Sequence, residues 1–271
     1  MRYSITIQRW HGIWAMELVM AGLSAQAFWA AMFVTLFAGF VKGAIGFALP
    51  MIMISVFSSF LPPEVALAGL MLPTTIANLG QAFRDGPRPV LAVIRKFWRF
   101  IVATLIFIAI SAQFVREIPQ DVFLVLLGIP ITIYALLQLL GRSLAIKLEH
   151  QSRAEWGLGV IAGLYGGMSG VWGPPLIVYL MSIGTLKSEM MRTQGVIYLI
   201  GSIMLLAAHL KSGVLTGPNA GFSAALVIPT LIGMVIGYYV GDKLDQVRFR
   251  WWTQVLLVLT GLNLVRRAVG F

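Results

Sequence analysis

Two stretches of the chain share one pattern of small residues and proline: AGFVKGAIGFALP at residues 38–50 and AGLYGGMSGVWGP at residues 162–174. With a shift of 124 residues they align without a gap as A-G-x3-G-x2-G-x3-P. Both lie in apolar surroundings, where glycine and proline interrupt a helix that would otherwise be continuous. We therefore predict an internal duplication in which each half contains one broken helix.

The composition indicates that this duplication is embedded in a lipid bilayer. Hydrophobic residues make up 59% of the 271 positions and charged residues 11%, whereas soluble domains have roughly 45–50% apolar and about 25% charged residues. The formal net charge is +10, but Lys and Arg stand at the ends of apolar runs, as in cytoplasmic loops. We expect no nucleic-acid partner. The predicted fold class is an all-α polytopic membrane helix bundle of two repeated halves.

The apolar runs define the predicted segments. A full span needs about 20 residues, so two short runs that begin at or near proline, 48–60 and 173–185, are too short to cross alone. We expect 8 to 10 inserted segments, with each broken helix followed by about three further spans. The other predicted segments are 26–45, 64–83, 98–115, 121–141, 156–171, 192–210, 220–241 and 250–266.

The predicted organisation has four parts: an N-terminal interfacial extension over 1–25, a first transmembrane repeat over 26–141, a linker over 142–155 and a second repeat over 156–271. The positive-inside rule makes the loop 84–99 and the linker cytoplasmic. It leaves open whether each half crosses four or five times. Five crossings would make the repeats antiparallel, which is a common transporter plan. We expect a multi-pass protein of the inner membrane.

Paired interruptions in a duplicated membrane protein predict a binding site near the midplane. The helices that open at Pro50 and Pro174 would direct free N–H groups at this site, which favours an anion. Lys42 lies about 16 residues into the first span, and a buried charge there usually faces a cavity or a partner. The alternatives for Lys42 are an ion pair with Glu17 or Glu64, or extension to the interface.

Other side chains complete the candidate binding site. Arg192 opens a predicted span, and its planar guanidinium suits sulfonate or carboxylate oxygens, although an interfacial role or a helix pair with Glu189 is an equal alternative. A polar stripe on residues 74–81 faces either substrate or another helix. The full candidate set is Lys42, Gly43, Gly46, Pro50, Thr75, Asn78, Gln81, Ser169, Gly170, Trp172, Pro174, Arg192 and Gln194.

Several kinds of chemistry find no support in the sequence. There is no cysteine, and nothing resembles a zinc-protease helix, a serine-hydrolase elbow or a nucleotide-binding loop. We therefore expect no metal, no cofactor and no enzymatic activity. Energy for transport would come from gradients, with proton coupling through Glu64 or Glu189 left open.

At the two glycine–proline stretches the sequence resembles the sulfite exporter TauE/SafE family of membrane permeases, and the resemblance extends over most of residues 26–266. It implies transport of sulfite, of organosulfonates such as sulfoacetate and taurine-related compounds, or of other small organic anions, mostly outward. The first copy departs from the usual glycine-rich form at Lys42 and at residues 47–49. Lys42 suits an anion without identifying one.

We therefore predict a secondary transporter, an exporter of a small sulfur-containing or carboxylate anion, that works by alternating access. An anion channel is the main alternative, and a membrane-embedded enzyme is a weaker one. The oligomeric state stays open, with a homodimer among the options.

Overall fold

The computed structural model describes residues 21–84, 86–142, 145, 149–241 and 243–270, and within this part every regular element is helical. The predicted N-terminal extension lies largely outside the described residues. The helices are α2 (Ala25–Ile45), α3 (Leu49–Phe57), α4 (Pro63–Ala82), α5 (Arg88–Lys96), α6 (Trp98–Ser111), the 3-10 turn η1 (Val115–Glu117), α7 (Gln120–Leu139), α8 (Gln151–Ser169), α9 (Gly173–Ser182), α10 (Lys187–Lys211), α11 (Pro218–Ala225), α12 (Val227–Gly241) and α13 (Gln246–Ala268).

Five helical stretches in the described part are long and apolar enough to cross a membrane: α2, α4, α7, residues 189–211 of α10, and α11 together with α12. Apolar side chains cover much of the outside of this bundle, among them Trp29, Phe33 and Ile232 at 66%, 71% and 50% exposure. Such a surface suits contact with lipid. These features confirm the all-helical membrane class.

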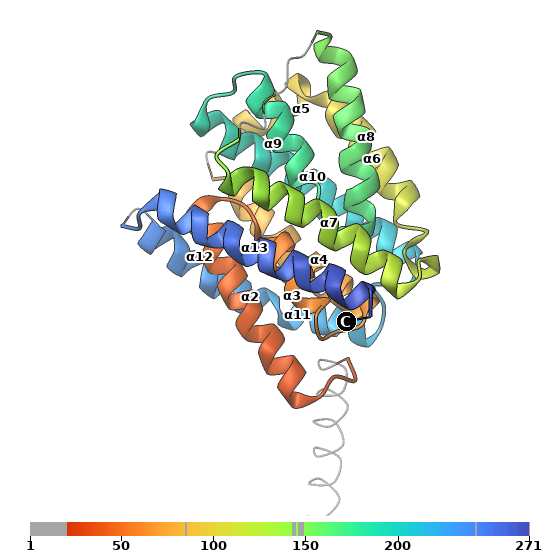
Figure 1. Ribbon diagram of the computed structural model, residues 1–271. Helices are drawn as coiled ribbons and strands as arrows, with labels where there is room; N and C mark the ends of the chain where they lie inside the picture. Colours follow the sequence, from red (N-terminus) through yellow and green to blue (C-terminus); the bar gives the residue numbers. More distant parts are fainter. Residues whose placement is uncertain (1–20, 85, 143–144, 146–148, 242, 271) are drawn as a thin grey trace, which may run out of the picture.

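Three helix pairs carry the most extensive packing: α2 with α12, α6 with α8, and α7 with α13 (Figure 1). The first two pairings are reciprocal, because the first helix of each predicted half packs against a late helix of the other. The α4–α10 and α7–α13 pairs each join corresponding helices across the 124-residue shift. Contacts between the predicted halves therefore hold the bundle together.

Glycines make the α2–α12 pairing possible. A Cβ added at Gly237 would lie 2.2 Å from the carbonyl oxygen of Phe40, and one added at Gly43 would lie 2.3 Å from that of Met234. No side chain fits at such distances, so the two backbones meet directly. The α6–α8 pairing uses Gly163 in the same way, 2.6 Å from the carbonyl oxygen of Thr104.

The boundaries differ from the sequence expectation in several places. Helices α8 and α10 start at Gln151 and Lys187, before the predicted starts at 156 and 192. Residues 84–99, expected to be a loop, contain the nine-residue helix α5, which starts after Pro87 and carries Arg95 and Lys96 in its last turn. The segment 220–241 is divided at Leu226 into α11 and α12. The short helices α3 and α9 agree with the predicted short runs and lie inside the bundle with their apolar residues buried.

Candidate functional site

The two broken helices end and restart in similar ways. Helix α2 stops at Gly46 with φ +84°, and α8 stops at Gly170 with φ +73°. Glycine adopts this left-handed conformation without a steric cost. After two or three residues the chain starts again, as α3 with Pro50 and as α9 with Pro174 in the first turn. Ala48 also has positive φ, +75°, which is costly for a residue with a side chain.

The two breaks meet at one cavity. Its volume is about 20 Å³, room for one water molecule. Phe47 and Ala48 contribute from the first break, and residues 170–173 contribute from the second. Because Ala48 precedes α3 and Gly173 begins α9, the N-terminal ends of both short helices border this cavity, and their partial positive charge favours an anion there.

Lys42 is the cation of this cavity. Its side chain is 2% exposed, and the ammonium donates hydrogen bonds to Oδ1 of Asn78 at 2.7 Å and Oε1 of Gln81 at 2.8 Å. It also lies 5.9 Å from the ring centroid of Tyr198, within reach of a cation–π interaction. Both oxygen partners are neutral amides. No carboxylate of the described residues forms an ion pair with Lys42.

The carboxylates considered from sequence lie elsewhere. Glu64 pairs with Arg116, with 3.4 Å between Oε1 and Nε. Glu189 pairs with Lys96 at 2.6 Å. Glu17 lies outside the described residues. Among the described residues the Lys42 side chain therefore has only neutral groups as partners, an arrangement that a bound anion would stabilise.

Other hydrogen-bond donors around the cavity have no partner among the described residues. They are Oγ1 of Thr74, Nε1 of Trp172 and the hydroxyl of Tyr198, all buried atoms. Buried polar groups in proteins nearly always have a hydrogen-bond partner. Three unsatisfied donors on residues that line the cavity, together with the buried ammonium, favour an anion there.

A larger cavity of about 760 Å³ adjoins the small one. We call it the vestibule. Its walls come from the end of α7, from α9, and from the first turns of α10 and α13. Phe47 and Ile177 line both cavities, so these two side chains form the partition between the vestibule and Lys42. Gln81 also links the two, because its Nε2 donates to the carbonyl oxygen of Met191, a vestibule residue, at 3.0 Å.

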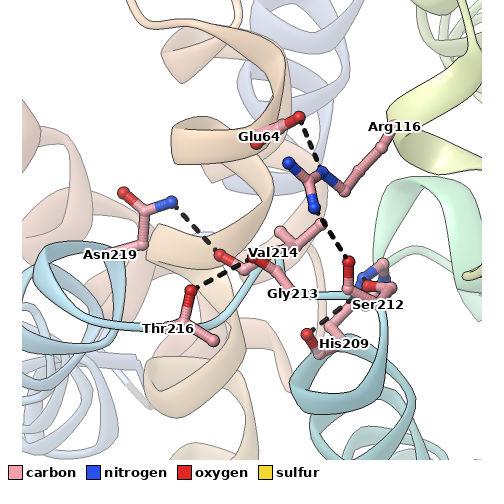
Figure 2. Close-up of polar contacts among 8 residues, drawn as sticks. All are labelled: Glu64, Arg116, His209, Ser212, Gly213, Val214, Thr216 and Asn219. Atoms are coloured by element: carbon pink, nitrogen blue, oxygen red, sulfur yellow. Dashed lines mark hydrogen bonds and ion pairs between the residues drawn. The ribbon is translucent and has the colours of Figure 1, made fainter.

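A polar cluster lies at the end of the bundle opposite the vestibule, and we call it the latch. It consists of Glu64, Arg116, His209 and Ser212 (Figure 2). Arg116 pairs with Glu64 and also donates to the carbonyl oxygen of Ser212 at 3.4 Å. Nε2 of His209 donates to the carbonyl oxygen of Gly167 at 2.8 Å, and its Nδ1 lies 3.1 Å from the Ser212 hydroxyl. The latch joins α4, α8, α10 and η1.

The vestibule and the latch lie at opposite ends of α10. Met191 borders the vestibule and Ser212 belongs to the latch, and 21 helical steps of 1.5 Å separate them by about 30 Å. Ala145 of the linker lines the vestibule, and Lys96 pairs with Glu189 in the first turn of α10. Residues 84–99 and the linker are both predicted to be cytoplasmic from their positive charge. The latch therefore lies on the side predicted to face away from the cytoplasm.

The structure brings some predicted site residues together and separates others. Lys42, Pro50, Asn78, Gly170 and Trp172 line the small cavity, and Gln81 holds Lys42. Ser169 accepts from the backbone N–H of Val171 and so shapes the second break.

The remaining candidates have other surroundings. Thr75 donates to the carbonyl oxygen of Met71, and its neighbour Thr74 is the one that lines the cavity. Gln194 lines the vestibule. Neither cavity includes Gly43, Gly46, Pro174 or Arg192 among its lining residues.

Tyr198 and Phe47 are the main residues that sequence reasoning missed. Tyr198 stands four positions after Gln194 and therefore on the same helix face. This spacing could have indicated that Tyr198 belongs to the candidate site. Phe47 carried none, because one more aromatic side chain in an apolar chain is not distinctive.

A family model described as Sulfite exporter TauE/SafE matches residues 31–264, nearly the whole chain. The comparison with curated proteins and the comparison with solved structures each gave no match.

Proposed function

Because the chain belongs to the sulfite exporter TauE/SafE family of membrane transporters, we propose that it is a secondary transporter that exports a small anion across the inner membrane. Sulfite, an organosulfonate such as sulfoacetate, or a small carboxylate fits the charge of the site, and the small cavity of about 20 Å³ widens to hold it. Lys42 supplies the positive charge that holds the anion.

The observation that carries this proposal is a buried ammonium that forms no ion pair with a carboxylate of the described residues. Lysine has three N–H donors, and the amide oxygens of Asn78 and Gln81 take two of them. The third is available to an anion, and the unsatisfied donors of Thr74, Trp172 and Tyr198 surround the same cavity. A charge in this position has a high desolvation cost unless an opposite charge joins it.

The two ends of the bundle support alternating access. The vestibule reaches the Phe47–Ile177 partition from the predicted cytoplasmic side, while the latch closes the opposite side. In our proposal this is the inward-facing state. An anion enters through the vestibule and passes the partition, and the small cavity expands to bind it. Rupture of the latch then opens the other side.

The reciprocal α2–α12 and α8–α6 pairings support a layout of two antiparallel repeats. In such a layout, a conformation that one half adopts in the inward-facing state can be adopted by the other half in the outward-facing state. Export also agrees with the membrane potential. A negative charge that moves outward from an inside-negative compartment gains about 2.3 kcal/mol per 100 mV. Outward transport of an anion therefore needs no ATP.

The proposal is tested with purified protein in liposomes loaded with sulfite, sulfoacetate or acetate. We expect saturable efflux, and counterflow of labelled anion when unlabelled anion is present on the far side. Lys42→Gln should abolish both, whereas Lys96→Gln, an exposed lysine paired with Glu189, should not. Non-saturating flux without counterflow would instead indicate a channel.

A further inference from the structure

The vestibule has the size of a ligand site rather than of a narrow passage. Its volume of about 760 Å³ lies within the range of pockets that bind drug-sized molecules, about 300–1,000 Å³. The small cavity near Lys42 measures about 20 Å³. An organic molecule with an aromatic ring can therefore enter the vestibule but cannot reach Lys42 while the partition of Phe47 and Ile177 stays in place.

The polar wall of the vestibule selects for negative charge. Arg250 on α13 is its cation, and no carboxylate of the described residues pairs with this arginine. The described residues of the lining include no Asp or Glu. A guanidinium next to a partly enclosed pocket suits sulfonate and carboxylate groups, which accept two hydrogen bonds from it.

Two buried polar atoms of the same wall also lack hydrogen-bond partners. Oε1 of Gln254, a residue that is 5% exposed, and Oγ1 of Thr185 both line the vestibule region without a partner among the described residues. Gln254 lies one helical turn after Arg250 on α13. A ligand that carries a hydroxyl or N–H donor beside its anionic group would satisfy Gln254 while it binds Arg250.

The rest of the wall is apolar and adaptable. Met181, Met190 and Met191 line it together with Trp251 and Val247. Methionine side chains change rotamer easily and adapt to differently shaped apolar ligands. Flat aromatic rings suit such a wall better than small hydrophilic anions do.

We infer that the vestibule is a second anion site, separate from the Lys42 cavity, that binds amphipathic organic anions such as aryl sulfonates and thereby blocks transport from the cytoplasmic side. The sulfonate binds Arg250 and the ring packs on the methionines. Because the vestibule and the small cavity share Phe47 and Ile177, a ring in the vestibule closes the path to Lys42. The binding claim stands on the pocket itself, and only the blocking claim rests on the proposed function.

The binding test uses the full chain in lipid nanodiscs and calorimetric titration with 2-naphthalenesulfonate. We expect saturable binding that Arg250→Gln weakens about ten-fold or more, the loss expected for a charge-assisted hydrogen bond. Arg248→Gln is the matched control, because this arginine lies two residues earlier, pairs with Asp245 and does not line the vestibule. Lys42→Gln should leave naphthalenesulfonate binding unchanged.

Two further probes separate the outcomes. The neutral 2-naphthalenemethanol should not show Arg250-dependent binding. In contrast, 6-hydroxy-2-naphthalenesulfonate should bind more tightly than 2-naphthalenesulfonate, and the Gln254→Leu substitution should remove this gain in affinity. The inference is overturned if Arg250→Gln and Arg248→Gln bind naphthalenesulfonate alike, or if Lys42→Gln abolishes this binding. If Arg250-dependent binding is present but Lys42→Gln still transports sulfite, the proposed function fails and the vestibule site stands.

Discussion

The ammonium nitrogen of Lys42 donates a hydrogen bond to Oδ1 of Asn78 over 2.7 Å, which ties the last turn of α2 to α4 at the point where both broken helices border a cavity. Asn78 is 1% exposed. The pair is therefore a buried, charge-assisted hydrogen bond whose cation has no acidic counterion in the part of the chain that the structure describes. Three predictions concern the site and its access, and one concerns the packing that supports it.

Replacement of Lys42 by Gln should keep the fold and remove anion binding. A net contribution of about 1.5–3 kcal/mol from a hydrogen bond to a charged group corresponds to roughly 10- to 100-fold in affinity. The measurement is the rise in unfolding temperature of the purified protein with increasing sulfite or sulfoacetate, which must accompany binding to the native state. An equal rise in unfolding temperature in Lys42→Gln and in the wild type would mean that the anion binds elsewhere in the protein.

Replacement of Asn78 by Leu should destabilise the protein, because it removes one of two acceptors from a buried ammonium. We expect a loss of about 1–3 kcal/mol, measured by thermal or denaturant unfolding in detergent. In a Lys42→Met background the same Asn78→Leu change should cost much less, and this double-mutant cycle isolates the pair. Additive losses would show that Asn78 acts on stability independently of Lys42.

Replacement of Arg116 by Gln should weaken the latch without unfolding the bundle. The Arg116 and Glu64 side chains are 54% and 42% exposed, so their ion pair contributes only about 0.2–1 kcal/mol. A shift of that size changes the ratio of inward- to outward-facing molecules by roughly 1.4- to five-fold. The chain has no cysteine, which permits single-cysteine reporters without background.

The latch readout is the rate of thiol labelling at Met181→Cys in the vestibule, in the presence and absence of Arg116→Gln. Arg116→Gln should slow labelling, because molecules leave the inward-facing state. Lys211→Gln, a charge change on the same end of α10 outside the latch, serves as the control. Unchanged labelling in Arg116→Gln would mean that the latch does not bias the two states.

Replacement of Gly237 by Ala should separate α12 from α2. The new Cβ would lie 2.2 Å from the carbonyl oxygen of Phe40. Because a backbone atom cannot move aside as the end of a flexible side chain can, we expect the free energy of unfolding to fall by about 1–3 kcal/mol. Gly157 is the matched control: it lies inside α8, and a Cβ there meets nothing within 4 Å. Gly157→Ala should be neutral, or stabilising by up to about 1 kcal/mol. Equal unfolding temperatures for the two variants would contradict the close α2–α12 contact.

Apolar length is a strong signal in an apolar chain, and it predicted two of the spans closely. The predicted 26–45 and 64–83 agree with α2 and α4 to within one residue. Helix α5 was missed since it has nine residues in a basic, proline-containing stretch, where neither length nor hydropathy separates a helix from a loop. The division of 220–241 at Leu226 was also invisible, because apolar residues continue through it.

The site was predictable in its polar part. Lys42, Asn78 and Gln81 stood out because polarity is rare within spans, and the structure joins all three by hydrogen bonds. Apolar lining such as Phe47 and Ile177 carries no distinguishing signal. Arg192 and Arg250 looked alike in sequence, as arginines near the start of a span, and only helix rotation decides that Arg250 lines the vestibule while Arg192 lines neither cavity.

The most direct test of the central claim is a structure of the protein with an anomalously scattering oxyanion, selenite or bromomethanesulfonate, bound at a concentration that saturates its effect on thermal stability. The account predicts one strong anomalous peak between the two breaks, within hydrogen-bond distance of the Lys42 ammonium, and no such peak in Lys42→Gln. A peak located only in the vestibule or at the bundle surface, with an unoccupied Lys42 cavity, would contradict it.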